Sequence, residues 1–336
     1  METIGLILIL AGTLILLILA IDVFLTVIHI GGGGIISKPF THFIWWIFSL
    51  FSGHNPTSPL LRYAGGVILV MLFFFWLFII WLGFSLVFLG DPDSVIDTIT
   101  EVSSNEVGKI YFVGYTLTSL GNGDLKAATD AWKIVTNIMG MGSMFFVGLA
   151  ISYLLPVLQA AVSERTLSTY IYQLGNTPEE IILNGWNGKN FNSLHQRFST
   201  LETMILKSSE LLLAYPILQY FHAVKREYST PLNIAKLDEA LTIWEIYEIE
   251  PNDDSFYWQG LRKAMDNYLL KLERGYIVPS NDPPPFEYEK IREYWDQSDF
   301  SDKTINEKLE DLKERRCLLF GFIKKDLWQW EDIKKA

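Results

Sequence analysis

The hydrophobic residues of this 336-residue chain are concentrated in its first half, where they form three long apolar runs. The runs extend from Ile4 to Ile30, from Ala64 to Leu89 and from Ile134 to Leu158. Each is at least as long as the ~20 residues that a helix needs to cross the hydrocarbon core of a bilayer. No basic segment precedes the first run, so it reads as a retained helix rather than a signal peptide. The pattern predicts three transmembrane helices.

The segment between the first two runs combines a glycine run with a short aromatic stretch. The four glycines from Gly31 to Gly34 predict a break, because glycine loses much backbone entropy in a helix. The stretch from His42 to Phe51 is too short to span a membrane. Trp45 and Trp46 suit the headgroup layer, so we expect an interfacial helix there.

The second half of the chain has the charge density of a soluble domain and the punctuation of helices. Thr177 is placed to cap a helix that begins at Pro178, with Glu180 completing a capping box. No strand alternation with a glycine-rich phosphate loop is present. The fold class is therefore predicted to be all-α, with further helices in the periodic segments Phe198–Tyr220, Leu232–Tyr247 and Phe256–Leu272, and a linker from Pro279 to Pro285.

The formal net charge of −11 removes one class of partner, because nucleic acid requires a basic face. The histidines show no metal-ligand spacing, and no catalytic triad order, Cys/His arrangement or phosphate loop is present. We therefore expect no enzymatic activity, no catalytic residue, no metal site and no organic cofactor.

The segment from Ile110 to Asp124, between the second and third runs, is too short and too polar at its end to cross the membrane. Non-helical backbone at membrane depth is tolerated only where it lines a cavity or is buried in protein, so this segment predicts a re-entrant pore loop. Four copies around an axis would supply rings of carbonyl oxygens that replace the hydration shell of an ion. Taken alone, Gly-Asn-Gly-Asp is equally typical of a surface turn.

From Ile110 to Leu158, with the span before it, the chain resembles the potassium-channel superfamily, whose pore loops end in a threonine-rich stretch and a Gly-aromatic-Gly-Asp filter. The resemblance implies a homotetramer in membrane lipid, with K⁺ ions in the filter as permeant monovalent cations. It also implies that Tyr111, Phe112 and Tyr115 support the filter. The filter residues implied in this way are Thr118, Ser119, Leu120, Gly121, Asn122, Gly123 and Asp124.

Two further features bear on conduction. The presence of glycine at positions 121 and 123 of the filter has a physical reason. Carbonyls aimed inward at successive positions require positive φ, which glycine adopts without steric cost. Gly140 and Gly142 resemble the inner-helix gating hinge, although a glycine in a membrane helix also serves as a close helix contact.

Asn122 departs from the family pattern, which has Tyr or Phe at this position. Asparagine is smaller and makes hydrogen bonds where an aromatic ring would pack. Three functions remain open: a K⁺ channel, a non-selective Na⁺/K⁺ channel, and a membrane receptor or scaffold with a vestigial pore segment.

The expected organisation has three parts: 1–63, an N-terminal span with an interfacial helix; 64–158, a pore module; and 159–336, a helical cytoplasmic domain. Lys38 and Arg62 follow the first span, whereas acidic residues follow the second, which predicts an external N-terminus and a cytoplasmic C-terminal domain in the plasma (inner) membrane. Asp22, the one acid inside a span, is expected to be functional or to meet Lys38 or Arg62.

Overall fold

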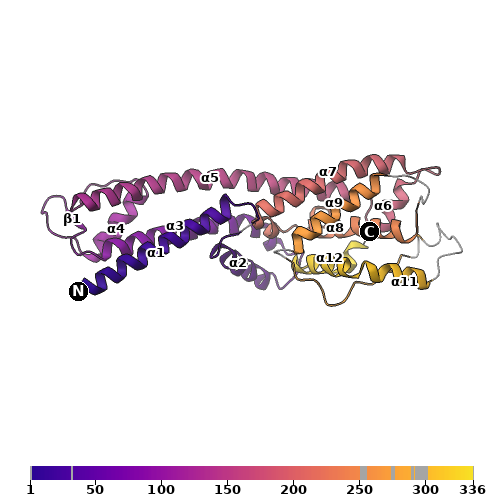
Figure 1. Cartoon of the computed structure of the whole chain (residues 1–336), viewed down its shortest axis with the longest axis horizontal. Coiled ribbons are helices and arrows are strands. Elements are labelled where there is room, and N and C mark those ends of the chain that lie inside the picture. Colours follow the sequence, from indigo (N-terminus) through magenta and orange to yellow (C-terminus); the bar gives the residue numbers. More distant parts are fainter. Residues whose placement is uncertain are drawn as a thin grey trace. The chain divides into compact units, whose positions relative to one another are not determined.

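The computed structural model describes residues 2–31, 33–249, 256–273, 277–288, 291 and 302–335, so Gly32 of the predicted break lies outside the described residues. The chain is mainly helical, as predicted, and forms two compact units (Figure 1). The first unit contains Met1–Ile44 and Gly66–Leu158, and the second contains Trp45–Gly65 and Gln159–Ala336. The segment that precedes the second apolar run thus belongs with the C-terminal half of the chain.

The first unit holds the three apolar helices: α1 (Glu2–Val27), α3 (Ala64–Leu89) and most of α5 (Asp130–Tyr172). By length and composition all three can cross a membrane. Glycines let α1 and α3 approach closely, since a Cβ added to Gly12 would lie 2.5 Å from the carbonyl oxygen of Gly83. Close backbone approach through small residues is a common way in which membrane helices pack.

Helix α5 is longer than the predicted third span, which was expected to end at Leu158. It continues through Pro156 to Tyr172. Beyond Leu158 its apolar residues keep helical spacing, and Leu167 and Ile171 are buried in the core of the second unit. Burial of this face maintains the helix until the chain turns before Gly175.

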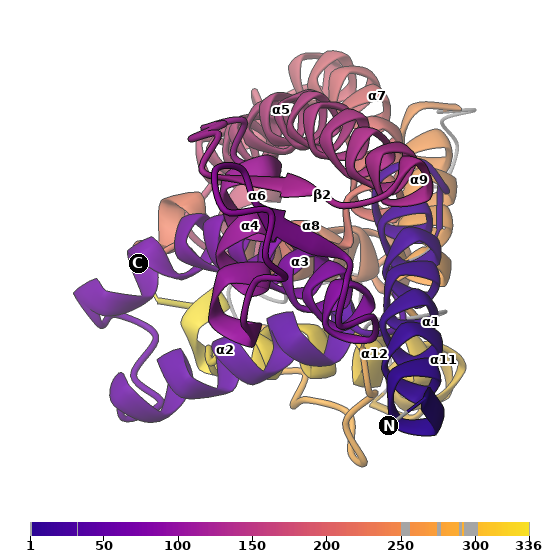
Figure 2. The ribbon, with the colours of Figure 1, turned by 90° about the vertical axis from the view of Figure 1, so that its left-hand side faces the viewer.

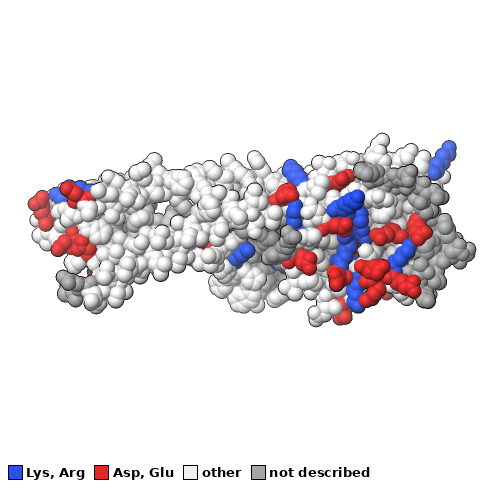
Figure 3. Space-filling view, in the orientation of Figure 1, with Lys and Arg blue, Asp and Glu red and all other residues white. Residues whose placement is uncertain are grey.

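Charged side chains are distributed unevenly over the two units. On the face shown in Figure 3 they gather over the second unit and at the end of the first unit that carries β1. The apolar helices between are almost free of them on this face, as expected of helices surrounded by lipid.

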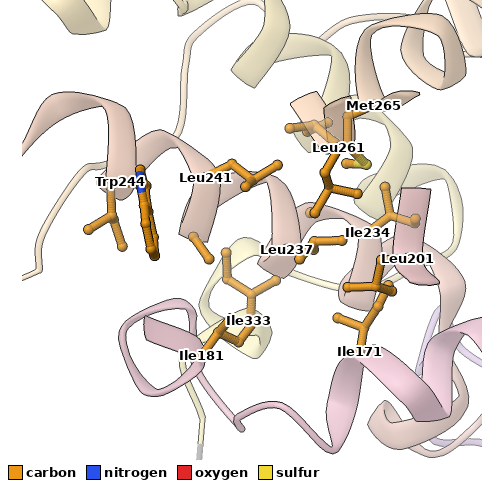
Figure 4. Close-up of a cluster of buried hydrophobic side chains, with 14 of the residues drawn as sticks. Ile171, Ile181, Leu201, Ile234, Leu237, Leu241, Trp244, Leu261, Met265 and Ile333 are labelled. Atoms are coloured by element: carbon orange, nitrogen blue, oxygen red, sulfur yellow. The ribbon is translucent and has the colours of Figure 1, made fainter. Parts of the chain in front are cut away.

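The second unit is a helical domain built around α8 (Thr230–Ile246), which is buried along nearly its whole length. Leu237 and Leu241 pack among side chains from the surrounding helices (Figure 4). Thr177 caps α6 by accepting the amide hydrogen of Glu180, which confirms the predicted helix start. The other elements are α2 (Ser37–Phe51, shared with the first unit), η1 (Pro59–Tyr63), α6 (Pro178–Gly185), α7 (Asn192–Ala214), η2 (Pro216–Tyr220), η3 (Arg226–Tyr228), α9 (Phe256–Glu273), α11 (Asp302–Asp311), α12 (Lys313–Lys325) and η4 (Trp330–Ile333).

Helix α8 carries two acidic residues into this core, and both are paired. Glu239 accepts a 2.7 Å hydrogen bond from Arg316 and a 2.9 Å bond from the hydroxyl of Tyr288. Asp238 pairs with Arg262 at 3.2 Å and with Arg315. Buried charges persist in proteins when they are paired in this way.

A two-stranded antiparallel sheet was not predicted from the sequence. Strand β1 (Val95–Asp97) pairs with β2 (Leu125–Ala127), with Val95 opposite Ala127. Both strands have only three residues, too few to show a period of two. Figure 2 looks onto this end of the first unit, where β2 lies beside α4 (Glu106–Leu117).

Candidate ion-conduction site

A short helix leads into the candidate filter, residues 118–124. Helix α4 begins at Glu106 because Asn105 caps it, accepting the amide hydrogen of Gly108 at 2.8 Å. It ends at Leu117, and the amide of Leu120 still donates to the carbonyl of Tyr115 at 2.9 Å. The chain therefore leaves the helix in a tight turn and becomes irregular within three residues.

The backbone of the candidate filter alternates in handedness. Ser119, Gly121 and Gly123 have φ values of 58°, 57° and 78°, whereas Leu120 and Asn122 between them have no positive φ. The predicted positive φ at the two glycines is confirmed. Ser119 shares it although it carries a Cβ, a conformation uncommon outside glycine. Left-handed residues at every second position distinguish this segment from a regular helix or strand, neither of which contains positive φ values.

Asn122 is tied to the helix behind it. Its side-chain amide donates a hydrogen bond to the hydroxyl of Tyr111 on α4. The polar interaction expected from an asparagine at this position is therefore present. The ring of Tyr111 also packs edge-to-face on Tyr115, with centroids 5.1 Å apart.

The other two aromatic residues of α4 have different neighbours. The hydroxyl of Tyr115 donates to the carbonyl of Leu125, just after the candidate filter, at 2.6 Å. Phe112 turns away and packs against Phe88 of α3, with centroids 5.4 Å apart. Among these three residues, Tyr111 and Tyr115 contact the filter segment or the strand after it, and Phe112 joins the helices together.

Residues outside the predicted set hold the end of the candidate filter. The hydroxyl of Thr98 donates to the carbonyl of Gly123 at 2.8 Å, and its amide donates to the carbonyl of Asp124 at 2.9 Å. Thr98 follows β1, so the small sheet brings it there. The sequence carries no signal for this contact, because it depends on pairing two three-residue strands that α4 and the filter separate.

A second group, also missed from the sequence, anchors the start of α4. The ammonium of Lys109 is buried and donates to the carbonyls of Asp91 and Pro92 at 2.6 and 2.8 Å. The carboxylate of Asp91 accepts the indole N–H of Trp132 at 2.7 Å. These bonds join the ends of α3, α4 and α5.

The predicted hinge glycines lie on an open side of α5. A Cβ added to Gly140 or Gly142 would meet no described residue within 4 Å, so neither glycine forms a close helix contact with the described part of the chain. The nearby hydroxyl of Ser143 donates to the carbonyl of Leu117 and links α5 to the end of α4. The hinge role stays a prediction.

Asp22 has partners other than the basic residues expected for it. Its fully buried carboxylate accepts the amide hydrogens of Ile36 and Ser37 at 2.7 and 3.2 Å, and also the hydroxyl of Ser37. The indole of Trp76 on α3 donates to it at 3.3 Å. Asp22 therefore caps the start of α2 and ties α1, α2 and α3 together.

The candidate filter is exposed on this single chain and offers backbone oxygens in place of a metal-binding side-chain cluster. Residues 118–124 are all exposed. Over the described part of the chain, no group of three or more His, Cys, Asp or Glu residues could hold a metal ion. A cation here would be coordinated by backbone carbonyl oxygens, of which those of Gly123 and Asp124 also accept the hydrogen bonds from Thr98.

Comparison with known proteins shows that the sequence of the chain is similar to that of a membrane protein. No protein-family model and no solved structure matches it. Over 333 residues the chain is 29% identical to the uncharacterized membrane protein YdjJ of Bacillus subtilis (strain 168), covering 98% of this chain and 96% of that protein. The similarity extends over both halves of the chain and agrees with the three apolar helices, which are long enough to cross a membrane.

Proposed function

We propose that this chain forms a tetrameric cation channel that conducts K⁺ through residues 118–124. The observation that supports the proposal is the alternation of positive φ at Ser119, Gly121 and Gly123 in a segment that lies between two apolar helices. In the proposed pore, four such segments around an axis supply the backbone carbonyl oxygens that replace the hydration shell of a monovalent cation.

The support for a tetramer is chemical. Residues 118–124 are exposed in one chain, and a single such segment cannot surround an ion. Four copies would enclose it and would bury apolar side chains now exposed on α5, such as Met141, Met144 and Phe145. Conduction of this kind needs no catalytic residue, organic cofactor or nucleic-acid partner.

The proposed orientation puts the N-terminus and the small sheet outside the cell and the second unit in the cytoplasm, with the protein in the plasma membrane. The basic residues Lys38 and Arg62 between α1 and α3 support this orientation, since they favour the cytoplasmic side. The external face would then carry Asp91, Asp97 and Asp124, whose charge attracts cations.

Asn122 is the residue on which the ion selectivity of the proposed pore depends. The bond from Asn122 to Tyr111 supports K⁺ selectivity, because it restrains the filter where an aromatic ring normally does. The small size of asparagine favours the second candidate, a non-selective Na⁺/K⁺ channel. A receptor or scaffold with a vestigial pore segment is the third, because the second unit is a complete helical domain of its own.

The test is the reversal potential of the purified protein in planar bilayers under a KCl/NaCl gradient, with an Asn122→Tyr variant beside it. We expect reversal near the K⁺ equilibrium potential. Reversal near zero that moves towards K⁺ in the variant would establish the non-selective channel.

Absence of current from both proteins would support the receptor. Thr13→Val serves as the control, because the Thr13 hydroxyl is exposed and bonds only the carbonyl of Ile9 in its own helix. This variant should conduct like the native chain.

A further inference from the structure

His222 joins three separate parts of the second unit. Its Nδ1 lies 2.7 Å from a carboxylate oxygen of Asp326, and its Nε2 lies 2.7 Å from the carbonyl oxygen of Pro56. The imidazole side chain has no exposed surface. Pro56 belongs to residues 52–58, the loop between α2 and η1, which we call the leading loop because it precedes α3.

The two partners of His222 fix its protonation state. The Pro56 carbonyl can only accept a hydrogen bond, and so can an ionised carboxylate. A neutral imidazole carries one N–H and can donate to only one of them. With both contacts at 2.7 Å, the ring must therefore donate from both nitrogens, as an imidazolium. The proton belongs to the histidine rather than to Asp326, because a carboxylic acid is ordinarily about two to three pKa units stronger.

The surroundings retain this proton. Burial alone would lower the pKa of His222, but the adjacent Asp326 carboxylate, together with the hydrogen bonds to Asp326 and Pro56, outweighs burial and raises the pKa above its ordinary value of 6.5. The rings of Trp45 on α2 and Trp328 after α12 lie about the imidazole, each with its centroid 6.1 Å away.

The charged groups facing His222 are few. Asp326 is the acidic group, and the neighbouring Lys325 bonds the side chain of Gln219 instead. Burial lowers the pKa of Lys325 to about 8, with Asp326 opposing it. From α2 the facing residue is Trp45, and from the leading loop it is Pro56, neither of them ionisable. His54 in the same loop is exposed.

We propose that His222 is a proton-binding site that fastens the leading loop to the rest of the second unit, and that loss of the proton releases the loop. A neutral His222 keeps one N–H, which the Asp326 carboxylate holds more strongly than a carbonyl does. The bond to Pro56 is then lost and leaves the carbonyl facing a ring nitrogen without hydrogen.

The direction of the pH dependence follows from the raised pKa. Because the folded state holds the proton more tightly than the unfolded chain, the fastening is fully present below pH 6.5 and is lost as pH rises through the raised pKa of His222. The unit therefore acts as a sensor that loosens on alkalinisation. This inference concerns the fastening alone and holds whether or not the chain conducts ions.

The experiment uses the full chain in lipid nanodiscs, with Cys317 replaced by alanine and a nitroxide on Thr57→Cys in the leading loop. Thr57 is exposed, so the label can be accommodated. Electron paramagnetic resonance spectra from pH 5.5 to 9 should show a mobile component that grows with a midpoint above pH 6.5.

Two substitutions test whether the His222–Asp326 pair causes the pH-dependent mobility of the label. Asp326→Asn should shift the midpoint down by about one pH unit or more, because it removes the charge that holds the proton. His222→Gln should abolish the transition. His54→Gln and Lys325→Gln should leave the midpoint unchanged. A midpoint that stays fixed in Asp326→Asn, that moves in Lys325→Gln, or that is absent from the native sequence would overturn the proposal.

Discussion

The side-chain amide of Asn122 donates its hydrogen bond to the hydroxyl of Tyr111, eleven residues earlier on the helix that precedes the candidate filter. The two residues belong to different kinds of structure, since Tyr111 lies in α4 and Asn122 lies between two left-handed glycines. The backbone of a helix moves less than irregular backbone does. The bond to Tyr111 therefore restrains the movement of Asn122 in the candidate filter.

Loss of the Tyr111 hydroxyl should loosen the filter. We expect Tyr111→Phe to lower the K⁺/Na⁺ permeability ratio by about fivefold, corresponding to the ~1 kcal/mol of one hydrogen bond. Reversal potentials in mixed KCl/NaCl measure this ratio. Thr116→Val is the matched control, because the Thr116 hydroxyl bonds only the carbonyl of Phe112 within the same helix. An unchanged ratio in Tyr111→Phe would separate this bond from selectivity.

Substitution of Asp22 should destabilise the first unit. Both carboxylate oxygens of Asp22 accept hydrogen bonds, from backbone amides, from the Ser37 hydroxyl and from the Trp76 indole. Asp22→Asn keeps one of these acceptor oxygens and replaces the other with an NH₂ group that faces other donors. We expect a loss of about 2–4 kcal/mol, seen as a lower melting temperature in detergent. Trp76→Phe should cost about 1 kcal/mol. If Asp22→Asn melts like the exposed control Thr13→Val, the carboxylate has no such role.

The outer face of α2 should lie in lipid. Phe43, Trp46 and Leu50 are each more than half exposed at helical spacing, whereas the opposite face buries Thr41 and Ser49. The buried face also contains Ile44 and Trp45, so α2 carries apolar side chains on both faces, unlike a soluble surface helix. The predicted interfacial helix is thus divided: Trp46 faces outward, but Trp45 is buried beside Tyr220.

Nitroxides at Trp46→Cys and Leu50→Cys, in a Cys317→Ala background in vesicles, should be relaxed strongly by oxygen and weakly by a water-soluble nickel complex. Gln196→Cys on α7 is the exposed, soluble-side control and should show the reverse. Weak relaxation of the α2 labels by both reagents would mean that protein covers this face, and strong relaxation by nickel would mean water.

Breaking the buried ion pair of Glu239 should have a large effect on the second unit. Arg316→Met leaves the Glu239 carboxylate buried without its cation, at an expected cost of about 3–5 kcal/mol in unfolding free energy. Lys313→Met, on the same helix, breaks a solvent-exposed pair with Glu310 and should have a much smaller effect, because water screens the two charges. Denaturant unfolding of the two variants compares them directly, and equal losses would contradict the assignment.

Local structure could be predicted from the sequence wherever it depends on the residues of one continuous segment. The apolar run from Ala64 to Leu89 coincides with α3, and Thr177 caps α6 as its pattern indicates. The positive φ of Gly121 and Gly123 follows from the spacing of residues that lack a Cβ.

What escaped the sequence depends on pairs of distant residues. Thr98 holds the carbonyl of Gly123 through a sheet whose strands are too short to show a pattern. Asp22 was expected to be functional or to meet Lys38 or Arg62, and its carboxylate accepts backbone amide hydrogens at the start of α2. The role of His222 needs Pro56 and Asp326 beside it, and sequence spacing cannot supply that.

Among the described residues, side chains that hold residues 118–124 and their neighbours Leu117 and Leu125 come from nearby chain: Thr98, Tyr111, Tyr115 and Ser143 lie within one contiguous stretch of the first unit. Such a stretch can acquire its geometry while the ribosome is still making the helical domain that follows. Residues 98–143 contain both partners of each of these bonds. Changes in the sequence of the second unit therefore leave the partners that hold the backbone around Gly121 and Gly123 in place.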